Sequence, residues 1–203
     1  WIDPFPESQW SDDFLRFYAE LEAFLRDEVD SDAIDKSGEY GDDVLDRLRK
    51  MGAFGIKIPK SYGGLGLTQA EYCRALEMAS RYDGNIVALL SAHQSIGLPQ
   101  PLKLFGTPEQ KKEWFPRLAK GAISAFALTE PDVGSVPARL ATTATRTDSG
   151  DFVLDGLKLW ITNGTLAEVM VVMARHPDTG KISAFIVETD QPGVSVDYRC
   201  RFM

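Results

Sequence analysis

SAFALTEPDVGS, residues 124–135, is the stretch at which this sequence changes character. It begins as an apolar run typical of a buried β-strand and continues as acid, proline, glycine and serine, which are typical of turns. These residues are consistent with a plain surface turn. They are also consistent with a ligand loop, because Gly134 permits close backbone approach and successive N–H groups bind an anion or a polar ring edge. Thr129 and Ser135 add hydroxyl groups that both donate and accept hydrogen bonds.

Before this stretch the apolar residues follow a helical period. Residues 9–29, QWSDDFLRFYAELEAFLRDEV, predict an amphipathic helix with one apolar face. The apolar positions of this helix are Trp10, Phe14, Phe17, Tyr18, Leu21, Phe24 and Leu25. A shorter helix is predicted over residues 42–52, where Gly52 marks its end. Residues 1–121 are therefore predicted to form an α-helical domain.

Further helices are indicated by their start signals and by their composition. Thr68 with Glu71, and Thr107 with Gln110, have the spacing of capping boxes, in which two side chains satisfy the first free N–H groups of a helix. Residues 85–98, NIVALLSAHQSIGL, are apolar almost all round, which predicts a helix buried on every side. His93 within it is interpreted as a hydrogen-bonded core residue.

After residue 121 the period falls to two, which is typical of β-strands. Strands are predicted within AISAFAL (122–128), ATTATRT (141–147), DFVLDGLKLWITN (151–163), EVMVVMARH (168–176) and KISAFIVE (181–188). The predicted fold class is α+β, with an antiparallel, barrel-like β domain over residues 122–203 following the helical domain. About five strands are too few to close a barrel. We therefore expect more chain to follow Met203, and the missing initiator Met leads us to expect that the other end is cut as well.

Composition restricts the possible partners and compartments. The 203 residues carry 22 Lys and Arg against 30 Asp and Glu, and this net charge of −8 argues against nucleic acid and anionic membranes as partners. No 18-residue apolar run predicts a membrane span, and no secretory signal precedes the first helix. Cys73 and Cys200 are interpreted as free thiols in a reducing, cytoplasmic compartment, and two histidines argue against a zinc site, so no metal is expected.

A second motif, LDGLKLWITNG, occupies residues 154–164. It predicts a hairpin whose second strand carries Trp160 and Thr162. Trp160 is open to two interpretations, as a core residue or as a wall on which a flat polar ring stacks. The second is favoured by the polar neighbours Thr162 and Asn163 at the strand end.

These motifs together resemble the acyl-CoA dehydrogenase family. The resemblance rests on FALTEPDVGS (126–135), followed further along the chain by GLKLWITNG (156–164). GGLGL (63–67), AHQSIG (92–97) and LFGTPEQKKEWFPRLAKG (104–121) are similar to the family's helical domain, nearest to its very-long-chain branch. The likeness covers nearly the whole chain.

The resemblance implies a fold of three domains and an FAD cofactor. The chain would hold the N-terminal helical domain and part of the middle β domain, and would stop before the C-terminal helical bundle. The residues implied to contact the flavin are Phe126, Leu128, Thr129, Gly134, Ser135, Trp160, Ile161 and Thr162. Trp160 would cover one ring face, while Thr129 and Thr162 would bond its polar edge. Ser135 would also touch the acyl-CoA thioester, and Gly97 would leave volume for a long acyl chain.

The implied reaction is the α,β-dehydrogenation of a fatty acyl-CoA to the trans-2-enoyl-CoA, a step of fatty-acid β-oxidation. In the family the base is a glutamate of the C-terminal domain, so no catalytic residue is assigned in this chain and the fragment alone is expected to be inactive. Glu130 is given a capping or charge-pairing role instead. The implied partners are an acyl-CoA substrate, an electron-transfer flavoprotein and further copies of the chain in a dimer or tetramer.

Two alternatives remain beside the dehydrogenase. One is a flavin monooxygenase or nitroalkane oxidase on the same fold, and the other is a non-catalytic binding module. Val136 is the one clear departure from the family pattern, which usually has aspartate there. An aspartate would cap nearby N–H groups and valine cannot, so we expect this loop to be less well ordered than in the family.

Overall fold

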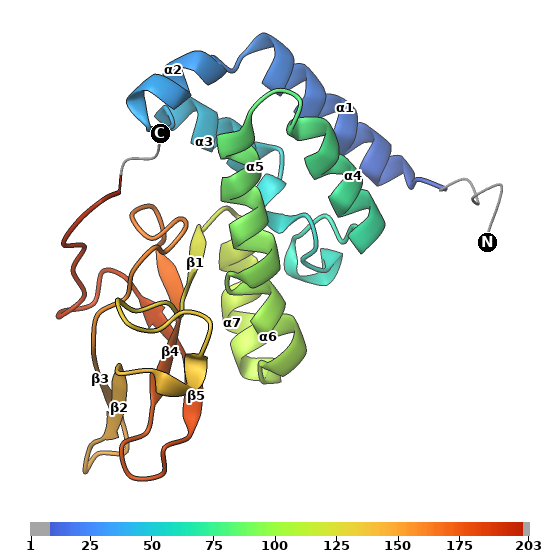
Figure 1. Cartoon of the computed structure of the whole chain (residues 1–203). Coiled ribbons are helices and arrows are strands. Elements are labelled where there is room, and N and C mark those ends of the chain that lie inside the picture. Colours follow the sequence, from blue (N-terminus) through green and yellow to red (C-terminus); the bar gives the residue numbers. More distant parts are fainter. Residues whose placement is uncertain (1–8, 201–203) are drawn as a thin grey trace, which may run out of the picture.

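A computed structural model describes residues 9–200 as a helical half followed by a sheet half (Figure 1). The α-helices are α1 (Asp12–Asp27), α2 (Ser31–Ser37), α3 (Asp42–Lys50), α4 (Gln69–Ala79), α5 (Gly84–Ser91), α6 (Pro99–Phe105) and α7 (Pro108–Ala119). Shorter turns are the 3₁₀ turns η1 (Ala53–Gly55), η2 (Lys60–Tyr62) and η4 (Pro137–Arg139) and the π-helical turn η3 (Ala92–Ile96). The strands are β1 (Ser124–Ala127), β2 (Thr143–Arg146), β3 (Phe152–Asp155), β4 (Val169–Arg175) and β5 (Ile182–Glu188).

Helix α1 is the amphipathic helix that the sequence predicts. Its buried residues are Phe14, Phe17, Leu21, Phe24 and Leu25. They belong to a core cluster that also includes Leu48 of α3, Ala75 of α4 and Leu89 of α5. Helices α2 and α6 were not predicted, because seven residues carry too little periodicity to be recognised.

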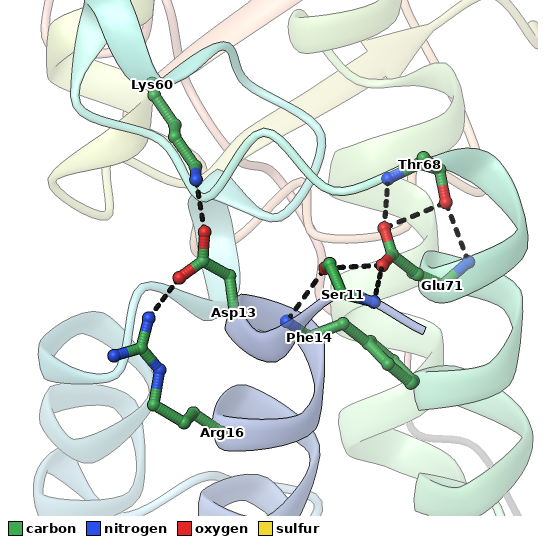
Figure 2. A network of polar contacts seen from close by, with 7 residues as sticks. All are labelled: Ser11, Asp13, Phe14, Arg16, Lys60, Thr68 and Glu71. Atoms are coloured by element: carbon green, nitrogen blue, oxygen red, sulfur yellow. Dashed lines mark hydrogen bonds and ion pairs between the residues drawn. The ribbon is translucent and has the colours of Figure 1, made fainter. Parts of the chain in front are cut away.

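One buried carboxylate, that of Glu71, joins the N-termini of α1 and α4 (Figure 2). It accepts hydrogen bonds from the backbone N and the hydroxyl of Thr68 at 2.8 and 2.9 Å, which completes the predicted capping box. It also accepts from the backbone N of Ser11 at 3.0 Å and from its hydroxyl at 2.6 Å. Burial alone would raise the pKa of Glu71, but these bonds lower it to about 2. A second contact nearby pairs Asp13 of α1 with Lys60 of η2.

The other helix predictions are confirmed in part. Thr107 and Gln110 form the predicted capping box, with Pro108 in the first turn of α7. The helix predicted over residues 85–98 is interrupted, because α5 passes into the π-helical turn η3. It is also buried on one side only, since Ala88 is exposed and Ile96 is 51% exposed.

The sheet is mixed where an antiparallel sheet was predicted. Its order is β1-β4-β2-β3, and β5 also pairs with β4. β4 runs parallel to β1, from Ser124↔Val169 to Ala127↔Val172, and antiparallel to β5 along its whole length. The parallel pair arises because the chain leaves β1, forms the β2–β3 hairpin and returns beside β1. Alternation along a strand shows which faces are buried but does not set the direction of its neighbour.

The second strand of the hairpin predicted at residues 154–164 is absent from the structure, which has irregular backbone there. Trp160 and Asn163 have φ of 57° and 67°. Left-handed backbone is uncommon for residues other than glycine and is incompatible with a regular strand.

The sheet and the helices share a core at their junction. The buried members of this cluster are Ile58, Leu98, Leu102, Trp114, Phe115, Leu118, Ala119, Val169 and Val171. Two of them lie on β4, and most of the others lie on α6 and α7. Helix α7 ends at Ala119 and β1 begins at Ser124, on either side of the domain boundary predicted after residue 121. Within residues 9–200 no helix has both the length and the apolar composition needed to cross a bilayer.

Candidate functional site at the end of strand β1

Strand β1 is anchored to the helical half at its first residue. The hydroxyl of Ser124 accepts a hydrogen bond from the backbone N of Leu98 at 3.0 Å. The backbone N of Ser124 donates to His93 Nδ1 at 3.1 Å, and its hydroxyl lies 2.9 Å from the same atom. The start of β1 is thereby fixed against η3 and α6, so the loop that follows β1 leaves from a defined point.

His93 is a core residue, as the sequence analysis proposed. It is fully buried, and its Nε2 lies 2.9 Å from the carbonyl oxygen of Phe54. Since that oxygen only accepts, Nε2 carries the proton and Nδ1 accepts from Ser124. Burial lowers the pKa of His93 to about 4. The imidazole is therefore neutral near pH 7 and has no free nitrogen for catalysis.

We call residues 128–136 the first loop. It turns sharply, because Glu130 and Val133 exchange backbone hydrogen bonds of 2.8 and 3.1 Å. The Glu130 carboxylate is buried and accepts from the backbone N of Ala141 at 2.6 Å, and from the backbone N and hydroxyl of Thr142 at 3.0 and 2.5 Å. It also forms an ion pair of 2.8 Å with Lys158. The charge-pairing role of Glu130 is thus confirmed.

The pKa of Glu130 reflects these contacts. Burial by itself would raise it, but the hydrogen bonds from Lys158, Thr142 and the Ala141 backbone lower it to about 2. A carboxylate this acidic and this fully bonded holds a structure together and does not accept a substrate proton at neutral pH.

We call residues 157–164 the second loop. It joins the first loop through the backbone N of Leu159, which donates to the carbonyl oxygen of Thr129 at 2.8 Å. At its far end the Asn163 amide donates to the carbonyl oxygen of Leu89 at 3.0 Å, and the Asn163 carbonyl accepts from Ala167 N at 2.8 Å. The second loop is therefore tied both to the first loop and to α5.

The predicted site residues differ in exposure. Phe126, Leu128, Thr129 and Ile161 are half-buried, whereas Gly134, Ser135, Trp160 and Thr162 are exposed. Trp160 is 64% exposed, so its interpretation as a core residue is wrong. The hydrogen bond between Leu159 N and the Thr129 carbonyl joins the two loops at the residue before Trp160. Gly134 has open space around it, which leaves room for a ligand to approach.

Gly97 is explained differently from what was predicted. A Cβ on this residue would lie 2.5 Å from the Ser124 hydroxyl and 2.6 Å from the carbonyl oxygen of His93. The side-chain volume at Gly97 is therefore filled, and the proposed reason, that it leaves a pocket empty, is wrong. Close packing of η3 against β1 requires glycine there, and its contact with a substrate stays a prediction.

Val136 is 51% exposed and begins the turn η4 without a side-chain cap. The turn is closed by backbone bonds alone, from Arg139 N to the Val136 carbonyl and from Leu140 N to the Pro137 carbonyl, both of 3.1 Å. The valine thus supplies no substitute for the aspartate usual in the family.

The arrangement fits a flat ring with a polar edge. An exposed indole offers a face for stacking, and the neighbouring Thr129 and Thr162 offer hydroxyls that bond either a donor or an acceptor.

Residues 9–200 contain no group of three or more His, Cys, Asp or Glu side chains placed to hold a metal ion. Cys73 and Cys200 are both free thiols.

Two polar residues that support the site were not assigned a role from the sequence. Lys158 lies between Leu157 and Leu159 and was interpreted as part of a strand, while Asn163 was noted only as polar. A lysine flanked by leucines beside a ligand motif is a weak signal of a buried cation. The partners of both residues lie far away in the sequence, so no local pattern identifies them.

Comparison with known proteins assigns the chain to a family. Residues 11–122 match the acyl-CoA dehydrogenase N-terminal domain, and residues 125–201 match the middle domain. The probable acyl-CoA dehydrogenase FadE10 of Mycobacterium tuberculosis is 50% identical over 209 residues, which cover 100% of this chain and 32% of that protein. The mouse very long-chain specific acyl-CoA dehydrogenase is 39% identical over 89% of this chain and 28% of its own length.

Solved structures agree with this assignment. Butyryl-CoA dehydrogenase from Megasphaera elsdenii superposes with a TM-score of 0.82 and 30% identity, covering 93% of this chain and 51% of that chain. An acyl-CoA dehydrogenase from Bacillus anthracis, complexed with FAD, gives a TM-score of 0.83 and 36% identity over 94% of this chain and 33% of that chain. The chain spans about a third of the length of its curated relatives, and it belongs to the acyl-CoA dehydrogenase family.

Proposed function

We propose that this chain is the flavin-contacting part of an FAD-dependent acyl-CoA dehydrogenase that converts a fatty acyl-CoA to the trans-2-enoyl-CoA. The observation that carries the proposal is the exposed Trp160, held in left-handed backbone beside the hydroxyl-bearing first loop. Large aromatic side chains are buried on average, so an exposed one held in an uncommon conformation indicates a ligand face.

Each predicted residue has a defined task in this proposal. Trp160 stacks on one face of the isoalloxazine ring, and the hydroxyls of Thr129 and Thr162 bond its polar edge. Phe126, Leu128 and Ile161 exclude water from the apolar part of the ring. Gly134 lets the backbone approach, and Ser135 orients the thioester arm of the substrate.

A bound FAD supplies the two-electron redox chemistry that these side chains lack. The residues of this chain contribute orientation and desolvation. Glu130 does not remove the α proton of the substrate, because its carboxylate is occupied by Lys158 and Thr142. We assign the removal of that proton to a carboxylate outside the 203 residues.

The name of one relative favours a long acyl chain, since the very long-chain specific enzyme matches 89% of this chain. We further propose an electron-transfer flavoprotein as the acceptor, assembly of the full-length protein into dimers or tetramers, and a cytoplasmic location. A monooxygenase or nitroalkane oxidase on the same fold remains the alternative, distinguished by fast reaction of its reduced flavin with oxygen.

The test uses the full-length protein and two variants. The wild type should bind FAD and lose the visible flavin absorbance when a fatty acyl-CoA is added without oxygen. Trp160→Ala should raise the Kd for FAD about tenfold, since lost aromatic stacking is worth about 1 kcal/mol or slightly more. Phe105→Ala is the matched control, because Phe105 is an exposed aromatic on α6 outside the site.

Three results would count against the proposal. A wild type that cannot be reconstituted with FAD rejects the flavoprotein. An unchanged FAD affinity in Trp160→Ala rejects the ring as a stacking wall. FAD binding without bleaching by any fatty acyl-CoA favours the binding module or the oxidase.

A further inference from the structure

Lys158 lies where the two loops meet, and its side chain is only 12% exposed. Its ammonium group contacts three acceptors: the carbonyl oxygen of Leu128 at 3.2 Å, Glu130 Oε1 at 2.8 Å and the carbonyl oxygen of Met173 at 2.7 Å. A lysine has three N–H donors, so each donor has one acceptor. The acceptors lie on two separate segments, the first loop and β4.

This ion pair is a poor source of stability for the fold as such. Taking a lysine and a glutamate out of water costs several kcal/mol per ion, and apolar residues of similar size often serve stability as well or better. Burial indeed lowers the pKa of Lys158, and Glu130 only partly offsets that effect. The contacts of the pair indicate instead what it holds in place.

Lys158 contacts the residues directly before and after Thr129. Two of its acceptors belong to Leu128 and Glu130, the residues on either side, and the next residue after the lysine, Leu159, donates to the Thr129 carbonyl. Trp160 follows Leu159 directly. The bonds made at Lys158 and at Leu159 therefore tie the backbone on both sides of Thr129 to the chain directly before Trp160.

The left-handed backbone of Trp160 strengthens this link. For a residue other than glycine this conformation costs about 1–2 kcal/mol and persists only where neighbouring contacts enforce it. Lys158 holds the chain on one side of Trp160, and Asn163 holds it on the other through the bond to Leu89. Without the lysine contacts, the single bond from Leu159 N to the Thr129 carbonyl is left to hold the chain on that side of Trp160.

We propose that Lys158 is a positioning residue of the flavin site, which holds the first and second loops at the spacing that a flat ring needs between Thr129 and Trp160. This inference rests on the proposed function. It adds a residue that itself does not touch the flavin but decides whether the residues that do are correctly placed.

The test is made on the full-length protein with Lys158→Met, which keeps an unbranched side chain and removes the charge and all three donors. The Kd for FAD, the visible circular dichroism of the bound flavin and the unfolding temperature are measured. We expect the Kd to rise at least tenfold and the flavin dichroism to change, since ring and hydroxyl no longer fit together.

Glu71→Gln is the matched control, because Glu71, like Lys158, is a charged residue with a largely buried side chain and several hydrogen bonds, but lies between α1 and α4, away from both loops. It should lower the unfolding temperature while leaving the Kd for FAD within twofold of the wild type. A loss of FAD in the control equal to that in Lys158→Met would overturn the inference, because general destabilisation would then explain both.

A double variant, Lys158→Met with Glu130→Gln, covers the case in which the single variant does not fold. It leaves no unpaired buried charge, so it should regain stability yet still bind FAD at least tenfold more weakly than the wild type. FAD affinity within twofold of the wild type, in either variant, overturns the inference and leaves the proposed function intact. A wild type that binds no FAD overturns both.

Discussion

Glu71→Gln tests the joint between α1 and α4 quantitatively. The carboxylate accepts four hydrogen bonds, two from Ser11 and two from Thr68. Its pKa falls from the ordinary 4.5 to about 2, which corresponds to roughly 3 kcal/mol of preference for the charged form in the folded state. Glutamine keeps one oxygen and turns an NH₂ group toward donors. We therefore expect the variant to lose about 2–3 kcal/mol of unfolding free energy near pH 7.

The stabilisation by Glu71 should depend on pH in a definite direction. Because the folded pKa of Glu71 is depressed, its stabilisation is fully present above about pH 4.5 and is lost as the pH falls toward 2. A glutamine at this position does not titrate. The difference in stability between the wild type and Glu71→Gln should therefore shrink as the solution is acidified through this window.

The assay is urea unfolding of both full-length proteins, followed by circular dichroism at about pH 7 and about pH 3. Glu77→Gln on the same helix is the control, since Glu77 pairs with Arg74 and Arg81 at the surface and its loss should leave the midpoint unchanged. The reasoning is refuted if Glu71→Gln unfolds at the wild-type midpoint near pH 7. It is also refuted if the difference between the two proteins is the same at both pH values.

Three further predictions concern residues around the site. Acidification from about pH 6.5 to 4 should lower the unfolding free energy of the wild type by up to roughly 3 kcal/mol, because the pKa of His93 is depressed in the folded state. In His93→Gln the urea midpoint should lack this part of the pH dependence. A pH dependence equal to that of the wild type contradicts the assignment. Gly97→Ala should destabilise the fold by about 1–3 kcal/mol, because the added Cβ would collide with Ser124. Gly134→Ala places its Cβ in open space and should keep the wild-type unfolding temperature. Equal unfolding temperatures for the two variants would refute the packing role of Gly97. Val136→Asp should add about 0.5–1 kcal/mol by capping η4, measured against Val136→Leu, and a gain shared by both would exclude capping.

Local sequence signals predicted those features whose partners lie close in the chain. Thr68 with Glu71 and Thr107 with Gln110 are three residues apart, so both capping boxes were identified and both are confirmed. The additional bonds from Ser11 to Glu71 span 60 residues and leave no local signature. Glu71 was therefore predicted as the cap of one helix and proves to cap two.

In the β half, too, local sequence signals do not reveal partners that are distant in the chain. The positions of β1, β4 and β5 followed from apolar alternation, but the parallel pairing of β1 with β4 depends on the path of the chain between them. The second loop was assigned to a strand because its residues have strand propensity. Tertiary hydrogen bonds from Lys158 and Asn163 override that propensity and hold Trp160 at φ 57°.

The site divides into exposed contact residues and buried polar supports, and the first loop has support on one side only. Glu130 is fixed by Lys158 and by backbone groups beyond the loop, so Thr129 beside it is well defined. Residues 134–139 are all exposed, and backbone bonds at Val136 and Pro137 are all that close their turn. Ser135 therefore has no buried anchor, and a ligand at this arm must itself contribute the contacts that order it. An aspartate at position 136 would supply part of that order in advance. With valine there, the arm depends for its order on the flavin and substrate that we propose it binds.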